Sequence, residues 1–273
     1  MTMQASTPRY RPAPWIYLIL VLVWSWACYG MVIALGKPWL ELPGVFLMAA
    51  GGLGPLVVAV MMIGLGHWDF AVDRNIRAFL WRTFNPRTAP TRWFAIIAAV
   101  VFGLYVVPPL LDPAIPLEKV IVKGPTVFLL VGFFFGALEE PGWRGYAQES
   151  LQRRMSVATA SLIIGVFWAL WHVPLFFIEG TYQNILGVNT VAFWTYMFSL
   201  VAVAPVFAWV YNGAGRSIFA AMIAHGMANV AGEVSADVSP WSALGATIVI
   251  ALVITIGSWH WMGRPSIPSK RER

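Results

Sequence analysis

The sequence predicts an all-α, polytopic membrane protein with about eight transmembrane helices around a polar intramembrane cavity. Of its 273 residues, 59% are hydrophobic and 11% are charged, whereas soluble domains average about 45–50% and about 25%. So few charged side chains cannot cover a soluble fold of this size, which excludes a cytosolic globular enzyme and a disordered chain. A secreted disulfide scaffold is excluded as well, because Cys28 is the only cysteine in the sequence.

The hydrophobic residues fall in stretches close to the about 20 residues that a helix needs to cross a bilayer. These stretches are continuously apolar, so they favour helices over the alternating strands of a barrel. The first stretch follows Arg9 and Arg11, as in a signal peptide, but it exceeds the roughly 7–15 residues of a signal core, and we expect it to be retained. The eight predicted spans are Trp15–Leu35, Gly44–Leu65, Trp93–Leu111, Pro125–Tyr146, Met155–Phe177, Val188–Tyr211, Ser217–Val234 and Trp241–Met262.

The charges of the loops predict the orientation, because cytoplasmic loops are rich in lysine and arginine. With the N-terminus inside, only Lys37, Lys119 and Lys123 of the 18 basic residues fall outside. We therefore predict that both termini are cytoplasmic and that the membrane is a bacterial plasma membrane. The net charge of +6 fits an anionic leaflet, and we expect no nucleic-acid partner.

The sequence divides into a cytoplasmic N-terminal segment (residues 1–14), one membrane domain (residues 15–262) and a basic cytoplasmic tail (residues 263–273). Within the membrane domain, the hydrophilic stretch His67–Arg92 is expected to lie along the inner surface as a short amphipathic element.

Polar residues inside the spans are the candidates for function, because a charge at the bilayer centre costs at least about 2.5–3.5 kcal/mol. Three predicted spans carry them, and the residues are Glu139, Glu140, Arg144, His172, His225 and Asn229. Glu140 and Arg144 lie four residues apart on one helical face and can pair as a structural clamp. Glu139 then points away from the face that carries this pair.

Pro141 and Gly142 follow the two acids and should kink or loosen the helix. Irregular backbone at membrane depth is tolerated only where protein or a water-filled cavity covers it. The sequence therefore predicts a hydrated cavity bordered by Glu139.

Two chemistries are open for these residues, and both lead to hydrolysis of an acyl bond. A carboxylate beside imidazoles can take a proton from water, while histidine and asparagine N–H groups stabilise an oxyanion. Alternatively, Glu139, His172 and His225 ligate a divalent metal such as zinc, with one position open for water. The His-Glu-x-x-His spacing of many zinc proteases is absent from the sequence.

At these residues the sequence resembles the CPBP intramembrane proteases, which include the type II CAAX prenyl endopeptidases and the bacterial abortive-infection-type proteins. The pattern Glu-Glu-x-x-x-Arg is matched by Glu139, Glu140 and Arg144. The pattern Phe-x-x-x-His is matched by His172, with Trp168 in the aromatic position, and His-x-x-x-Asn by His225 and Asn229. The three patterns occur in the family's order, across roughly residues 130–232.

The resemblance implies an intramembrane endopeptidase. It implies that Glu139 and His172 activate water, that Glu140 and Arg144 support them, and that His225 and Asn229 hold the oxyanion. It implies a peptide or protein substrate near the membrane lipid, with a prenylated tail as one family substrate. The candidates for a substrate groove, with packing as the alternative role, are Trp143, Trp168 and Trp171.

Two other functions stay open at this point. One is a non-catalytic membrane scaffold or immunity protein with the same fold. The other is a proton-coupled transporter, since chains of glutamate and histidine also relay protons. A transporter predicts paired broken helices in two related halves, and the sequence shows no such repeat.

Overall fold

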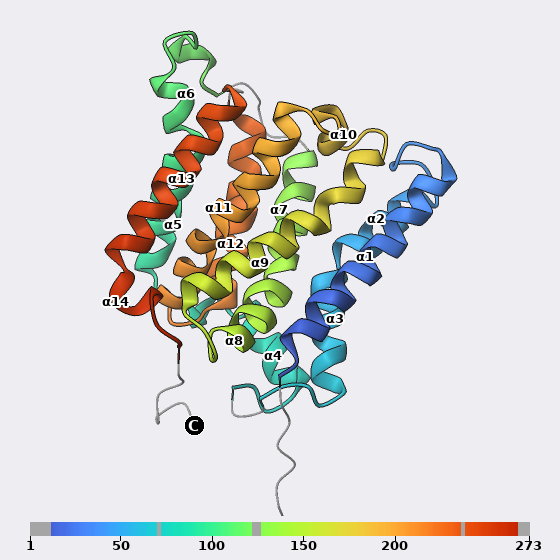
Figure 1. The fold of residues 1–273 in the computed structure, drawn as a ribbon, viewed down its shortest axis with the longest axis vertical. Coiled ribbons are helices and arrows are strands. Elements are labelled where there is room, and N and C mark those ends of the chain that lie inside the picture. The colour runs from blue at the N-terminus through green and yellow to red at the C-terminus, as the bar shows by residue number, and fades with distance from the viewer. Residues whose placement is uncertain (1–11, 70–71, 122–126, 236–237, 267–273) are drawn as a thin grey trace, which may run out of the picture.

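A computed structural model describes residues 12–69, 72–121, 127–235 and 238–266, with the side chains of residues 127–129 left out. The described residues form a bundle of helices, which confirms the all-α class (Figure 1). Besides the helices, the described residues contain an isolated antiparallel β-bridge between Ile121 and Ser235. Most of the predicted N-terminal segment and tail, namely residues 1–11 and 267–273, lies outside the described residues.

Among the described residues, four helical stretches are long and apolar enough to cross a membrane. They are α1 (Pro14–Leu35), α11 (Val191–Gly213), α13 (Pro240–Gly257), and α9 (Val157–His172) with the 3₁₀ turn that continues it (Val173–Phe177). A fifth span results if α2 (Gly44–Gly52) and α3 (Gly54–Gly64), which meet at 55°, are counted together. The chain is therefore an integral membrane protein, while the predicted count of eight spans is not confirmed.

Helices occupy the other predicted spans too, but they are short or broken. They are α5 (Arg92–Tyr105), α6 (Val107–Leu111), α7 (Val127–Glu140) and α12 (Ile218–Val234), while the short α14 (Trp259–Met262) follows α13 within the last predicted span. Proline lacks the backbone N–H and clashes with the preceding turn, and four of the breaks fall at or beside a proline. Those prolines are Pro55, Pro108, Pro141 and Pro174.

The loosening predicted at Pro141 takes the form of a π-helix. α7 runs directly into a π-helical segment, Pro141–Gln148, which leads into the short α8 (Glu149–Leu151). π-helical turns are rare and occur often at functional sites. The predicted amphipathic element is present as α4 (Ile76–Phe84), which begins at Asn75, whose side chain accepts a hydrogen bond from the amide of Ala78.

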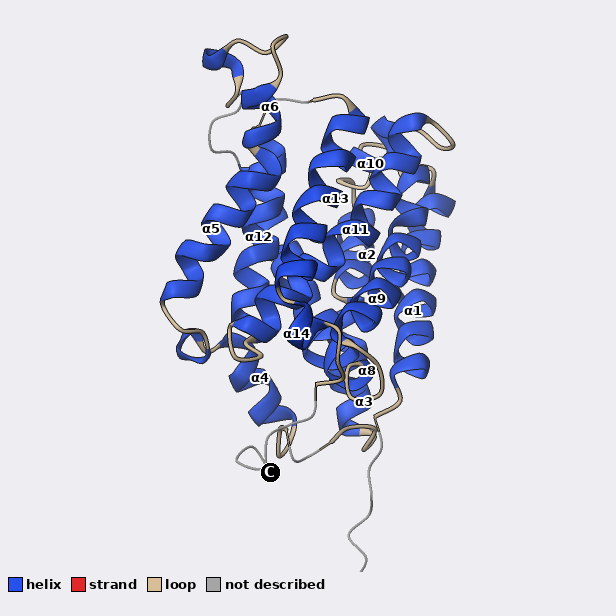
Figure 2. Ribbon diagram, turned by 60° about the vertical axis from the view of Figure 1, so that its left-hand side comes forward, coloured by secondary structure: helices blue, strands red, loops and turns tan. Residues whose placement is uncertain are grey.

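Small residues let α7 and α12 approach closely. α12 also lies beside α5, as Figure 2 shows. A Cβ added to Gly136 would lie 2.3 Å from Nδ2 of Asn229, and one added to Gly226 would lie 2.6 Å from Cδ2 of Phe133. Without this contact the polar residues of α12 could not reach those at the end of α7.

Gly142 gives the π-helical segment a similar contact with the N-terminal helices. A Cβ at this position would lie 2.4 Å from the carbonyl oxygen of Pro55 and 2.3 Å from the hydroxyl oxygen of Tyr17. Backbone atoms cannot move aside cheaply, so only glycine fits here.

We expect Gly142→Ala to destabilise the protein by about 1–3 kcal/mol, the usual cost of overpacking a core. Gly30→Ala is the matched control, because nothing lies within 4 Å of a Cβ at that helical position. There the change should be neutral or stabilising by up to about 1 kcal/mol. Thermal unfolding of the detergent-solubilised protein measures both, and equal unfolding temperatures for the two variants would contradict the packing described.

Candidate active site

The predicted polar residues lie on three neighbouring elements: the junction of α7 with the π-helical segment, the end of α9, and α12. Five of the six are buried, and Asn229 is exposed. The buried residues are Glu139, Glu140, Arg144, His172 and His225.

Glu140 joins two of these elements through a single carboxylate oxygen. Its Oε1 accepts a hydrogen bond from Nη1 of Arg144 at 2.8 Å and another from Nδ1 of His225, also at 2.8 Å. Both Glu140 and Arg144 have no exposed surface. Charges taken out of water must be paired to be tolerated, so the predicted clamp is present and extends to a third residue.

Glu139 points away from this pair and is held by two tryptophans. Its Oε2 accepts a hydrogen bond from Nε1 of Trp143 at 3.1 Å and one from Nε1 of Trp168 at 2.8 Å. Neither of these bonds uses Oε1. Two indole groups therefore fix the orientation of the carboxylate while its other oxygen stays available to a further donor such as water.

Both histidines are anchored through Nδ1. Nδ1 of His172 lies 2.8 Å from the carbonyl oxygen of Trp168, and because a carbonyl only accepts, the proton lies on Nδ1. Nδ1 of His225 faces the carboxylate of Glu140 in the same manner. In each ring Nε2 is thus left for chemistry: as a lone pair in His172, and as a lone pair or an N–H group in His225.

Trp168 lies at the centre of the cluster. The centroid of its ring is 5.8 Å from that of His172 and 5.1 Å from that of His225, both in edge-to-face contact. The guanidinium carbon of Arg144 lies 5.5 Å from the Trp168 ring centroid and 4.9 Å from that of Phe207. One side chain therefore contacts candidate groups from all three elements.

Asn229 follows His225 by one turn and lies at the exposed edge. Its Nδ2 donates to the carbonyl oxygen of Gly132 at 2.9 Å, which ties α12 to α7. One of its two N–H groups is used in this bond, so at most one remains for an oxyanion.

The three tryptophans predicted as groove candidates are all buried. Trp143 and Trp168 donate to Glu139, and Trp171 packs edge-on against Tyr29 and His172. A cavity in the structure is lined by apolar residues of α5, α11 and α12, including Ile97, Phe207 and Ala224, without Glu139. A groove and a hydrated cavity at Glu139 stay predictions.

The residues proposed as metal ligands do not gather into a metal site. Among the described residues, no group of three or more histidine, cysteine, aspartate or glutamate side chains is placed to hold a metal ion. Each of Glu139, His172 and His225 contacts Trp168. Carboxylate and imidazole groups are ordinary zinc ligands, but the placement of these three side chains does not fit the ion.

Sequence reasoning missed two parts of this site. It did not identify the indole N–H groups of Trp143 and Trp168 as the donors to Glu139, although the spacing of four residues from Glu139 to Trp143 is a signal for the first. It also missed Phe207 and Tyr196 on α11, which contact the rings of His225 and His172. No motif distinguishes these aromatic residues from ordinary packing.

Two comparisons with known proteins match the part of the chain that bears these residues. Residues 121–231 match the family model "Type II CAAX prenyl endopeptidase Rce1-like". The chain is also 27% identical over 205 residues to "CAAX prenyl protease 2" of Methanococcus maripaludis, covering 70% of this chain and 72% of the relative. The matched segment contains all six polar residues of the cluster. The resemblance seen in the motifs is thus confirmed over residues 121–231 of this integral membrane protein, which are similar to the type II CAAX prenyl endopeptidase Rce1-like family.

Proposed function

We propose that this chain is an intramembrane endopeptidase whose reaction centre lies around Trp168. The observation that carries the proposal is the common arrangement of the reactive groups. Glu139 is fixed through one oxygen and both histidines through Nδ1, so that each leaves one reactive atom uncommitted. Pre-oriented groups of this kind lower a barrier because they need not reorganise during the reaction.

In the proposed reaction, a water molecule donates one proton to Glu139, and its oxygen attacks the carbonyl carbon of the scissile peptide bond. The lone pair at Nε2 of His172 accepts a hydrogen bond from the same water and orients it. The carbonyl oxygen becomes an oxyanion, which His225 stabilises through Nε2–H with help from the free N–H of Asn229. Glu139 then returns the proton to the leaving nitrogen as the C–N bond breaks.

Glu140 and Arg144 support this reaction by positioning His225. The carboxylate of Glu140 fixes the His225 ring and stabilises a positive charge on it. Arg144 pairs with this carboxylate and holds it in place. These two residues are thus positioning residues rather than participants.

We propose as substrate a membrane-associated peptide or protein, with a prenylated CAAX tail as the first to test. The name of the archaeal relative, a CAAX prenyl protease, supports this choice. We also propose that both termini face the cytoplasm. In support, the start of α1 and the end of α14 lie toward the same end of the bundle (Figure 1), and arginines are concentrated there.

Glu139→Gln and His172→Ala are each expected to lower the cleavage rate by about 10²–10⁴-fold, the usual contribution of a general base. Cleavage of a panel of farnesylated and unmodified tail peptides by the purified protein measures the effect. Glu179→Gln, which changes an exposed acid outside the cluster, is the control and should retain full activity.

Wild-type cleavage by Glu139→Gln would contradict the proposed role of Glu139. The same panel run with a chelator tests the metal alternative, which loss of wild-type activity would favour.

Trp168→Phe is expected to lower kcat by about ten- to a hundredfold with little change in KM. The variant keeps a smaller aromatic ring and removes the indole N–H that Glu139 accepts, and a hydrogen bond to a charged group is worth about 1.5–3 kcal/mol. Trp143→Phe removes the longer of the two bonds and should cost less. A change confined to KM in Trp168→Phe would indicate that Trp168 binds substrate instead.

Substitutions of the adjacent residues Glu139 and Glu140 are expected to differ in their effect on the free energy of unfolding. Glu140→Ala leaves Arg144 buried without its carboxylate, which typically costs about 3–5 kcal/mol. Glu139→Gln still accepts both indole bonds and should unfold close to the wild-type temperature. The double variant Glu140→Ala/Arg144→Met removes both charges and should recover most of the lost stability. If the double variant is no more stable than Glu140→Ala, the pairing is not the source of the loss.

A further inference from the structure

The two ends of the bundle carry very different charge. Toward the end where α1 begins and α3 ends, the described residues include nine arginines and three acids. Toward the opposite end they include two lysines and five acids. The arginines are Arg74, Arg77, Arg82, Arg87, Arg92, Arg153, Arg154, Arg216 and Arg264, and the three acids are Asp69, Asp73 and Glu149.

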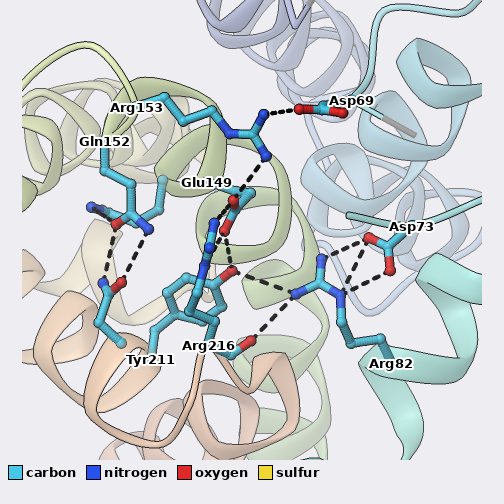
Figure 3. A network of polar contacts seen from close by, with 10 residues as sticks. Asp69, Asp73, Arg82, Glu149, Gln152, Arg153, Tyr211 and Arg216 are labelled. Atoms are coloured by element: carbon cyan, nitrogen blue, oxygen red, sulfur yellow. Dashed lines mark hydrogen bonds and ion pairs between the residues drawn. The ribbon is translucent and has the colours of Figure 1, made fainter. Parts of the chain in front are cut away.

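A network at this end engages all three acids (Figure 3). Asp73 binds Arg82 through both carboxylate oxygens, at 2.8–3.2 Å. Glu149, which is completely buried, pairs with Arg153 and Arg216, and Asp69 pairs with Arg153. The acids at this end are therefore committed to three partly buried arginines.

The network leaves four arginines on and around α4 with their charge uncompensated. Arg74, Arg77, Arg87 and Arg92 are exposed, and none of them forms an ion pair with an acid in the part of the chain that the structure describes. Together they form a compact basic segment within 19 residues of sequence.

The exposed face of α4 combines this charge with aromatic side chains. Arg77, Trp81 and Phe84 follow one another at intervals of four and three residues, which places them on one helical face. Trp81 is 65% exposed and Phe84 is 48% exposed. The opposite face carries Phe79 and Thr83, both completely buried. We call the exposed set (Arg74, Arg77, Trp81, Phe84, Arg87 and Arg92) the α4 surface.

The α4 surface is held in a fixed orientation. Besides Asp73, Arg82 donates to the hydroxyl of Tyr211 on α11 at 3.4 Å and to the carbonyl oxygen of Arg216 at 3.3 Å. Thr88 shares a hydrogen bond of 2.8 Å with Ser217, at the start of α12. α4 is therefore attached to the bundle through Arg82 and, beyond its C-terminal end, through Thr88.

We propose that the α4 surface binds the headgroups of anionic phospholipids. Guanidinium groups match phosphate oxygens in charge and in geometry. Tryptophan and phenylalanine beside them suit the boundary between headgroups and acyl chains, where amphipathic helices bury their apolar side chains. A nucleic acid would satisfy the arginines but gives no comparable environment to Phe84, and the chain is an integral membrane protein. The lipid surface is thus the partner that fits both kinds of side chain.

The test compares lipid retention by full-length variants. Each protein is mixed in detergent with equal amounts of phosphatidylglycerol and phosphatidylcholine of the same acyl chains, and the bound lipids are counted by native mass spectrometry. The variants are Arg77→Gln/Arg87→Gln, which changes the α4 surface, and Arg154→Gln/Arg264→Gln, which removes two exposed arginines at the same end but outside it. All four side chains are exposed, so both variants should unfold at the wild-type temperature.

Wild type and Arg154→Gln/Arg264→Gln are expected to retain phosphatidylglycerol over phosphatidylcholine. Arg77→Gln/Arg87→Gln should lose this preference by about fivefold for each arginine, as expected for a charge beside an anionic surface. Arg77→Lys/Arg87→Lys keeps the charge and should keep most of the preference.

Three results would overturn the proposal. An unchanged preference in Arg77→Gln/Arg87→Gln would exclude the α4 surface, and an equal loss in both glutamine variants would indicate net charge alone. Displacement of phosphatidylglycerol by an equal concentration of inorganic phosphate or of a short oligonucleotide would indicate a general anion site rather than a lipid surface.

Discussion

The arrangement of the candidate site depends on the need to pair a charge that is completely buried. Glu140 and Arg144 lie in an environment where an unpaired charge costs several kcal/mol, and each satisfies part of the other's requirement. The second bond to Glu140 comes from His225, 85 positions later in the chain. One carboxylate thus fixes α12 relative to the end of α7, and the small residues Gly136 and Gly226 make the required approach possible.

Trp168 contacts the remaining groups of the site around this pair. Its indole N–H binds Glu139, its carbonyl oxygen fixes the tautomer of His172, and its ring contacts His225 and Arg144. A phenylalanine in the same place would supply a smaller aromatic ring and the carbonyl oxygen but not the N–H group. The substitution in the family's motif therefore adds a hydrogen bond, and the carboxylate that receives it is the one proposed to activate water.

The charged network at the arginine-rich end has a different function from the cluster in the bundle. Its acids and buried arginines neutralise one another and attach α4, α8, α11 and the following loop in one place. Because those acids are used internally, the arginines that remain exposed face a partner outside the protein. α4 also contacts the π-helical segment through Phe79, since a Cβ at Gly145 would lie 3.1 Å from Cε2 of that ring, so the membrane-facing helix and the segment that bears Arg144 are direct neighbours.

The sequence by itself determined the helical membrane class, the places of the helices, the break at Pro141 and the identity of the polar residues. These follow from local properties: apolar length, the missing proline N–H, and the cost of a charge in lipid. The pairing of Glu140 with Arg144 was equally local, because the two lie on one helical face. The tertiary structure decided which distant groups meet. His225 binds Glu140, and Trp168 binds Glu139. Asn229 binds the carbonyl oxygen of Gly132 at the exposed edge rather than lying deep in the cluster. It also decided that the helices in several of the predicted spans are short or broken. Contacts between residues far apart in the chain depend on how closely helices pack, and that distance is set by side chains from several elements at once, which no single stretch of sequence contains.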